Sequence, residues 1–199
     1  MANFISIFRI FIAMLAVLLL FIPSTWAYVA AIVLSIIAFA MDGLDGYIAR
    51  KFNESSDLGA MLDIMGDRIV EMSYWIAFST LGWLWVIFPL ICVTRAFVTD
   101  GIRSVALAQG FTAFGEKTIQ SSKLGQFICA SKFMRISYAV AKVAAFIIII
   151  AGRIPGYEMY SFTPILQNIG LILAIFALIF CVVRGIPVVI ESKKLFEKK

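Results

Sequence analysis

Apolar segments long enough to cross a membrane recur along this chain and leave little sequence between them. Of its 199 residues, 62% are hydrophobic, whereas soluble domains are about half apolar. A transmembrane helix needs about 20 consecutive, mainly apolar residues. The pattern predicts an all-α integral membrane protein in which residues 1–199 form a single domain. Six transmembrane helices are expected, at residues 4–22, 25–49, 57–82, 84–108, 133–151 and 164–190.

The first apolar segment is interpreted as a retained membrane helix rather than as a signal peptide. One charge, Arg9, precedes its apolar run, and the run ends at Pro23 and Ser24 without a convincing small-residue cleavage site.

The distribution of positive charge predicts how the helices are oriented. Lys and Arg occur in the connections after the second and fourth segments and in the C-terminal tail, but not in the connections after the first and third segments. Positively charged connections tend to stay in the cytoplasm. We therefore expect both termini to be cytoplasmic, and we expect the protein to lie in the cell's cytoplasmic membrane with a polar cavity open to the cytoplasm.

Four aspartates lie where the second and third segments approach the cytoplasmic face. An unpaired charge at membrane depth costs at least about 2.5–3.5 kcal/mol on insertion scales. Asp42 and Asp45 are three positions apart, and Asp63 and Asp67 are four apart. Each pair therefore shares one face of a helix. Because the connection between the two segments is short, the helices are expected to be antiparallel neighbours with facing carboxylates.

This carboxylate pattern favours a site for divalent cations. The chain contains no histidine, so the ligands would be hard oxygens, which suit Mg²⁺, Mn²⁺ or Ca²⁺. Few positive charges stand near the aspartates in the sequence, which favours bound cations over a network of ion pairs. Small residues at Gly46, Ala49 and Gly59 leave room for a ligand or for close helix contact. Arg50 could hold a phosphate. The residues alone thus indicate metal-assisted handling of a phosphorylated ligand.

Eight residues at fixed offsets across these two segments resemble the signature of the CDP-alcohol phosphotransferases. They read Asp42-x2-Asp45-Gly46-x2-Ala49-Arg50-x8-Gly59-x3-Asp63-x3-Asp67. The resemblance implies six transmembrane helices, usually in a homodimer. It also implies transfer of a phosphatidyl group from CDP-diacylglycerol to an alcohol, with release of CMP.

The resemblance also assigns a role to each residue of the signature. Asp67 would be the catalytic base on the attacking hydroxyl. Two divalent ions, Mg²⁺ or Mn²⁺, would be held by Asp42, Asp45, Asp63 and Asp67. The CDP-lipid site would be shaped by Gly46, Ala49, Arg50 and Gly59.

The fourth segment bears on the identity of the alcohol. Its stretch from Arg95 to Arg103 looks like that of bacterial phosphatidylglycerophosphate synthases, which implies sn-glycerol 3-phosphate as acceptor and phosphatidylglycerophosphate as product. The pair Asp67-Arg68 looks more like enzymes that use inositol phosphate, so this acceptor or another alcohol is the alternative. The candidate acceptor-binding residues are Arg95, Arg103, Lys117, Lys123 and Arg135.

The charge of the chain and the positions of its acidic residues and cysteines argue against other classes of function. A net charge of +5 fits contact with anionic membrane lipid and gives no reason to expect nucleic acid. A transporter of divalent cations is the less favoured rival, because its acidic residues would lie near the midplane. The three cysteines, Cys92, Cys129 and Cys181, stand far apart in apolar sequence, which predicts a packing role and no disulfide.

Overall fold

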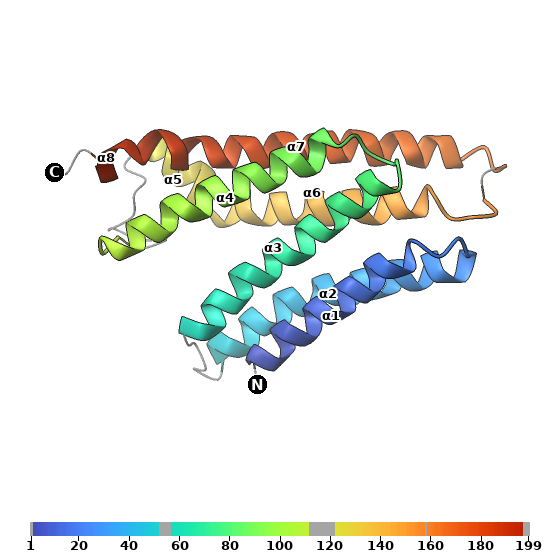
Figure 1. Cartoon of the computed structure of the whole chain (residues 1–199), viewed down its shortest axis with the longest axis horizontal. Helices are drawn as coiled ribbons and strands as arrows, with labels where there is room; N and C mark the ends of the chain where they lie inside the picture. Colours follow the sequence, from blue (N-terminus) through green and yellow to red (C-terminus); the bar gives the residue numbers. More distant parts are fainter. Residues whose placement is uncertain (1, 52–56, 112–121, 158, 197–199) are drawn as a thin grey trace. The chain divides into compact units, whose positions relative to one another are not determined.

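A computed structural model describes residues 2–51, 57–111, 122–157 and 159–196 (Figure 1). Every regular element in these residues is an α-helix, which confirms the predicted all-α class. The helices are α1 (Ala2–Leu19), α2 (Thr25–Lys51), α3 (Asp57–Thr80), α4 (Ile87–Ala108), α5 (Lys123–Ala130), α6 (Lys132–Ala151), α7 (Thr163–Glu191) and α8 (Lys193–Phe196).

Three of the described helices are long and apolar enough to cross a membrane. These stretches are Thr25–Gly43 of α2, Phe133–Ala151 of α6 and Thr163–Glu191 of α7. The apolar part of α1, Phe4–Leu19, is shorter. Helices α3 and α4 both contain several charged residues. Three candidate spans are therefore established, and the full set of six stays a prediction.

The turn between α3 and α4 is longer than the sequence predicted. Helix α4 begins at Ile87, three residues after the expected start at Leu84. The backbone N–H groups of Trp83 and Leu84 both donate to the carbonyl of Phe78, at 2.8 and 3.2 Å. Gly82 has a φ of 73°, a left-handed conformation that glycine adopts without steric cost. This turn closes the end of α3 before the next helix can start.

The chain divides into two compact units. The first unit comprises Met1–Val86 and Val143–Ile172, and the second comprises Ile87–Lys142 and Leu173–Lys199. In the first unit α1 packs against both α2 and α3, and Figure 1 shows α1 and α2 side by side.

An aromatic cluster forms the core of the first unit. Tyr74, Trp75 and Phe78 of α3 meet Phe146 of α6, with ring centroids 4.8–5.5 Å from that of Phe146. All four side chains are at most 1% exposed. Ser35 of α2 shares a hydrogen bond of 2.6 Å with the Tyr74 hydroxyl. These contacts tie α2, α3 and the second half of α6 together.

Replacing Phe146 with alanine should strongly destabilise this unit. Phe→Ala changes in a packed core cost about 3–5 kcal/mol, because they leave a cavity. We expect a clear fall in the thermal unfolding midpoint of the purified protein in detergent. Phe11→Ala is the matched control, because Phe11 is 69% exposed and should change the midpoint little. Equal effects of the two substitutions would contradict the assigned core.

The second unit contains a short helix, α5, which precedes α6 in the chain. Ser122 caps α5, and its Oγ accepts a hydrogen bond of 2.9 Å from the Gly125 N–H. The same hydroxyl is hydrogen-bonded to the Glu191 carboxylate at the end of α7. Just after α7, Leu195 of α8 forms a small buried contact with Ala106 of α4. These hydrogen bonds of the Ser122 hydroxyl fix the start of α5 against the end of α7.

Candidate active site

Three of the four predicted aspartates converge in the first unit. One carboxylate oxygen from each of Asp42, Asp63 and Asp67 lies within 4.8 Å of the other two. The side chains are 42%, 52% and 50% exposed, respectively. This arrangement confirms that carboxylates of α2 and α3 face each other, as the helical spacing predicted. These three residues are called the aspartate group below.

The other residues of the signature are only partly described. Asp45, Gly46, Ala49 and Arg50 belong to α2, but their side chains lie outside the described part of the chain. Gly59 is half-buried in the first turn of α3. The roles assigned to these positions therefore stay predictions.

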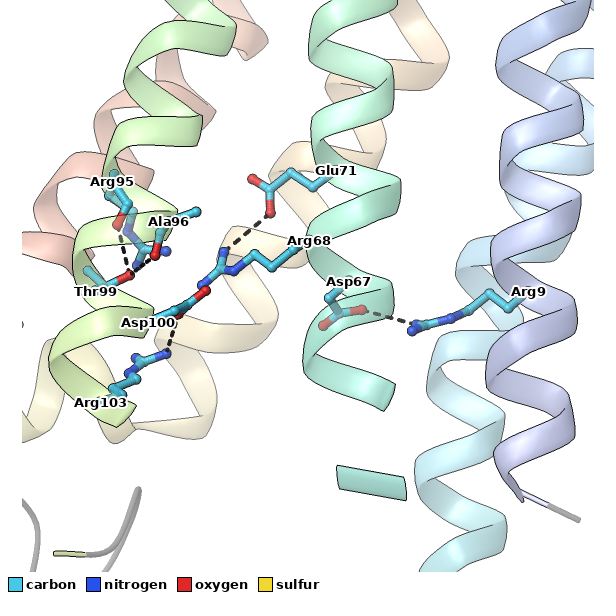
Figure 2. A network of polar contacts seen from close by, with 9 residues as sticks. All are labelled: Arg9, Asp67, Arg68, Glu71, Arg95, Ala96, Thr99, Asp100 and Arg103. Carbon is cyan, nitrogen blue, oxygen red and sulfur yellow. Dashed lines mark hydrogen bonds and ion pairs between the residues drawn. The ribbon is translucent and has the colours of Figure 1, made fainter. Parts of the chain in front are cut away.

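Arg9 of α1 makes ion pairs with the whole aspartate group. Its Nη1 lies 3.1 Å from Asp67 Oδ1 and also contacts Asp42 Oδ1, while its Nη2 lies 3.6 Å from Asp63 Oδ1. Figure 2 shows the contact with Asp67. Packing of α1 thus brings one positive charge to the aspartates from a distant part of the chain, a contact that the sequence analysis did not predict. A single arginine inside an apolar helix is the signal that could have identified it.

The chemistry and spacing of the aspartate group fit a divalent cation. Ligand oxygens lie about 2.0–2.6 Å from Mg²⁺ or Ca²⁺, so oxygens around one such cation are separated by up to about 4–5 Å. The 4.8 Å limit within the group falls in this range. The half-exposed carboxylates also leave a path for a cation to enter. Asp42, Asp63 and Asp67 would hold it.

Two further acidic residues form local ion pairs along their own helices. Arg68 Nη1 lies 3.8 Å from Glu71 Oε2 in α3, and Glu71 is 3% exposed. In α4, Arg103 Nη1 lies 3.7 Å from Asp100 Oδ1. Figure 2 shows both pairs as contacts within one helix. Each of these acidic residues is thus paired with an arginine one helical turn away on its own helix.

Three arginines lie near one another in the second unit. Arg95 and Arg103 come from α4, and Arg184 comes from α7. All three interact electrostatically with the Cys129 thiol of α5. The positive charges of Arg95 and Arg103 repel the positive charge of Arg184. The Nε atoms of Arg95 and Arg184 are buried without a hydrogen-bond partner among the described residues. This set is called the arginine group, and its chemistry suits an anion.

Sequence reasoning identified Arg95 and Arg103 but missed Arg184. Its guanidinium carbon lies 5.3 Å from the centre of the Tyr138 ring of α6, and the Lys142 ammonium lies 5.3 Å from the same ring. The next residue, Gly185, lets α7 approach α4, since a Cβ there would lie 3.0 Å from Arg95 Cγ. A lone arginine beside a glycine in an apolar helix was the available signal.

The remaining candidate acceptor residues are not part of this group as described. Arg135 is an exposed residue of α6. Lys117 lies outside the described residues. Lys123 is the first residue of α5, but its side chain is also outside the described part.

The cysteines behave as the sequence predicted. Cys92, Cys129 and Cys181 are all buried, and none of the three is in a disulfide. Burial raises the pKa of the Cys129 thiol, and the nearby arginines oppose this rise without cancelling it. The thiol therefore stays protonated at neutral pH, and it donates a hydrogen bond of 3.4 Å to the Arg184 carbonyl.

Comparison with known proteins identifies the same family that the motif between Asp42 and Asp67 resembles. The family model described as CDP-alcohol phosphatidyltransferase matches residues 1–183. A Pseudomonas fluorescens protein named CDP-diacylglycerol--glycerol-3-phosphate 3-phosphatidyltransferase is 31% identical over 115 residues, which are 57% of this chain and 59% of that protein. A protein of the same name from Escherichia coli K12 is 34% identical over 65 residues, 33% of this chain and 36% of that protein.

The two relatives are thus matched over about three fifths and about one third of their own lengths. The family model, in contrast, covers nearly the whole chain and includes both the aspartate group and Arg95 and Arg103. This chain therefore belongs to the CDP-alcohol phosphatidyltransferase family.

Proposed function

We propose that this protein transfers the phosphatidyl group of CDP-diacylglycerol to sn-glycerol 3-phosphate, forming phosphatidylglycerophosphate and releasing CMP. The observation that supports this most is the convergence of Asp42, Asp63 and Asp67 within a chain of this family. The names of the relatives support glycerol phosphate as the acceptor. The reaction would belong to phospholipid biosynthesis.

In this proposal the aspartate group, with Asp45, holds two ions of Mg²⁺ or Mn²⁺. Such ions neutralise a pyrophosphate and stabilise the phosphate that leaves. Asp67 takes the proton of the acceptor hydroxyl. The hydroxyl oxygen attacks the lipid-linked phosphorus, and CMP leaves. Arg50 contacts the phosphates of the CDP-lipid, and Gly46, Ala49 and Gly59 leave space for its nucleotide.

The arginine group is proposed to bind the phosphate of the acceptor. Guanidinium groups match phosphate oxygens through paired hydrogen bonds. The buried Nε atoms of Arg95 and Arg184, which have no hydrogen-bond partner in the described structure, are donors that a phosphate could use. Lys142 adds a further positive charge over the Tyr138 ring. Arg184 is thereby added to the acceptor residues that the sequence predicted.

The setting proposed for this reaction is the cytoplasmic membrane. Six transmembrane helices would place both termini and the polar cavity on the cytoplasmic side, where CMP and glycerol phosphate are soluble. The protein would act as a homodimer. Cross-linking of single-cysteine variants in intact and in inverted vesicles would test the orientation and the dimer.

The test of the proposed reaction is CMP release by the purified protein in detergent micelles. The assay contains CDP-diacylglycerol, Mn²⁺ or Mg²⁺, and in turn glycerol 3-phosphate, inositol phosphate, serine or phosphatidylglycerol. We expect metal-dependent CMP release that is fastest with glycerol 3-phosphate. Fastest release with inositol phosphate would establish the alternative acceptor. Release with none of them, together with cation flux in proteoliposomes, would replace the proposal with transport.

Replacing Arg184 with glutamine should weaken acceptor binding specifically. Hydrogen bonds to a charged group contribute about 1.5–3 kcal/mol, so the KM for glycerol 3-phosphate should rise roughly 10–100-fold. The KM for CDP-diacylglycerol should change little. Lys193→Gln removes one charge from an exposed position of the same unit and serves as the control. A KM for glycerol 3-phosphate that rises equally in both variants, or in neither, would contradict the assignment.

A further inference from the structure

Arg9 is a buried charge that the proposed reaction does not use. It is 3% exposed and is the single charged residue in the sequence of α1, Ala2–Leu19. A charge in such an apolar helix is costly unless it is paired. The pairing here is with all three members of the aspartate group. Arg9 therefore occupies the position at which the sequence predicts a cation.

Helix α3 provides space for this guanidinium at Gly66. A Cβ at this position would lie 3.0 Å from Arg9 Nη2 and 3.1 Å from Ile10 Cδ1. Gly66 stands between Asp63 and Asp67 in the sequence. The residue without a side chain is thus located where the guanidinium approaches the helix. This close approach is an observation independent of the ion pairs.

The charges of this arrangement do not cancel. Three carboxylates contribute −3 and Arg9 contributes +1, which leaves −2. The donors of Arg9 are also not saturated, since its Nε and Nη2 are buried and have no hydrogen-bond partner in the described structure. The net negative charge that remains still attracts divalent cations. Arg9 therefore reduces the repulsion among the carboxylates without replacing the cation.

We propose that Arg9 is a tethered counter-cation of the aspartate group. It holds the three carboxylates together before a divalent cation binds, and it competes with that cation for their oxygens. This inference rests on the proposed function only in taking the aspartate group as a cation site. Arg9 is a positioning residue, since it acts through the aspartates.

The two helices that hold the aspartates have contacts that do not depend on Arg9. Ser35 of α2 is hydrogen-bonded to Tyr74 of α3 at 2.6 Å, and the rings of Phe39 and Tyr74 are 5.7 Å apart. Helices α2 and α3 should therefore stay adjacent when Arg9 is replaced. Loss of its positive charge should then strengthen cation binding, because a competing like charge has been removed.

The test measures Mn²⁺ affinity directly, by titration of the purified full-length protein with the electron paramagnetic resonance signal of free Mn²⁺ as readout. We expect Arg9→Gln to lower the Kd for Mn²⁺ by about tenfold or more. Arg9→Lys, which keeps the charge, should stay near the unsubstituted value. Arg153→Gln is the control with the same change of charge in the same unit. Arg153 lies far from the aspartate group. The Thr25 hydroxyl at the start of α2 donates a hydrogen bond to the carbonyl of Pro155, which is close to Arg153 in the sequence, and Asp42 lies about 25 Å along α2 from Thr25.

Thermal unfolding separates this role from simple packing. Without metal, Arg9→Gln should melt at a lower temperature than the unsubstituted protein, because the carboxylates repel one another. Saturating Mn²⁺ should raise its midpoint by more than it raises that of the unsubstituted protein. A purely structural arginine would lower the midpoint equally with and without Mn²⁺, and that result would overturn the inference.

Gly66→Ala gives a second variant in case Arg9→Gln does not fold. Its Cβ would lie 3.0 Å from Arg9 Nη2 and would push the guanidinium slightly away from the carboxylates while keeping its positive charge on the chain, so Mn²⁺ should again bind more tightly, by less than in Arg9→Gln. Unchanged or weaker Mn²⁺ binding in the variants would overturn this inference alone. Tighter Mn²⁺ binding by the variants, combined with no CMP release by the unsubstituted protein, would support this inference and overturn the proposed reaction. An unsubstituted protein that binds no Mn²⁺ would overturn both.

Discussion

Asp67→Asn should reduce CMP release by about 10²–10⁴-fold, the contribution of a positioned general base. The Asp67 carboxylate is half exposed and lies among the oxygens of Asp42 and Asp63, so it can meet both a cation and an incoming hydroxyl. Asparagine keeps its size but neither accepts the proton nor carries the charge. The loss should appear in kcat at saturating Mn²⁺ and saturating acceptor.

Asp57→Asn is the matched control for this substitution. Asp57 is the first residue of α3, about 15 Å along the helix from Asp67. The control should keep nearly full activity. Binding of CDP-diacylglycerol to Asp67→Asn, measured by calorimetry, should remain detectable, because the other carboxylates are still present. An Asp67→Asn protein that retains activity within a few fold of the unsubstituted protein would refute the assigned base.

Removal of divalent cations should stop the reaction almost completely. Metal ions supply several kcal/mol of charge stabilisation in reactions of this type, which corresponds to a loss of roughly 10²–10³-fold or more. EDTA should therefore reduce CMP release to a trace. Addition of Mn²⁺ or Mg²⁺ in excess should restore it, and addition of Na⁺ should not.

Two controls make the chelation result specific. EDTA that is already saturated with Mg²⁺ should leave the rate unchanged, which excludes an effect of the chelator on the membrane protein itself. The concentration of Mn²⁺ that restores half the rate should be higher in Asp63→Asn than in the unsubstituted protein, because one ligand is missing. Activity that persists after exhaustive chelation would contradict a metal-dependent transfer.

The parts of the fold that follow from local periodicity could be predicted from the sequence. Helices α2 and α3 begin at Thr25 and Asp57, where the apolar pattern placed them. The spacing of Asp63 and Asp67, one helical turn, predicted that they share a face with access to Asp42. The short connection then allowed only antiparallel neighbours. These inferences need no knowledge of distant contacts.

The parts that depend on distant packing could not be predicted in this way. Arg9 is the single charge in α1 and Arg184 is the single arginine in α7, and no spacing rule connects them with Asp42 or Arg95. Their partners are determined by how α1 packs on α3 and how α7 approaches α4 at Gly185. A rule that assigns every intramembrane arginine a partner would have marked both residues without naming those partners.

The most direct measurement is anomalous X-ray diffraction at the manganese absorption edge, from crystals of this protein grown with Mn²⁺. We expect an anomalous peak about 2.0–2.6 Å from carboxylate oxygens of Asp42, Asp63 and Asp67. The same data should show the guanidinium of Arg9 withdrawn from at least one of these carboxylates. A manganese peak located only elsewhere, or no peak at these aspartates at saturating Mn²⁺, would contradict a metal site formed by these three residues.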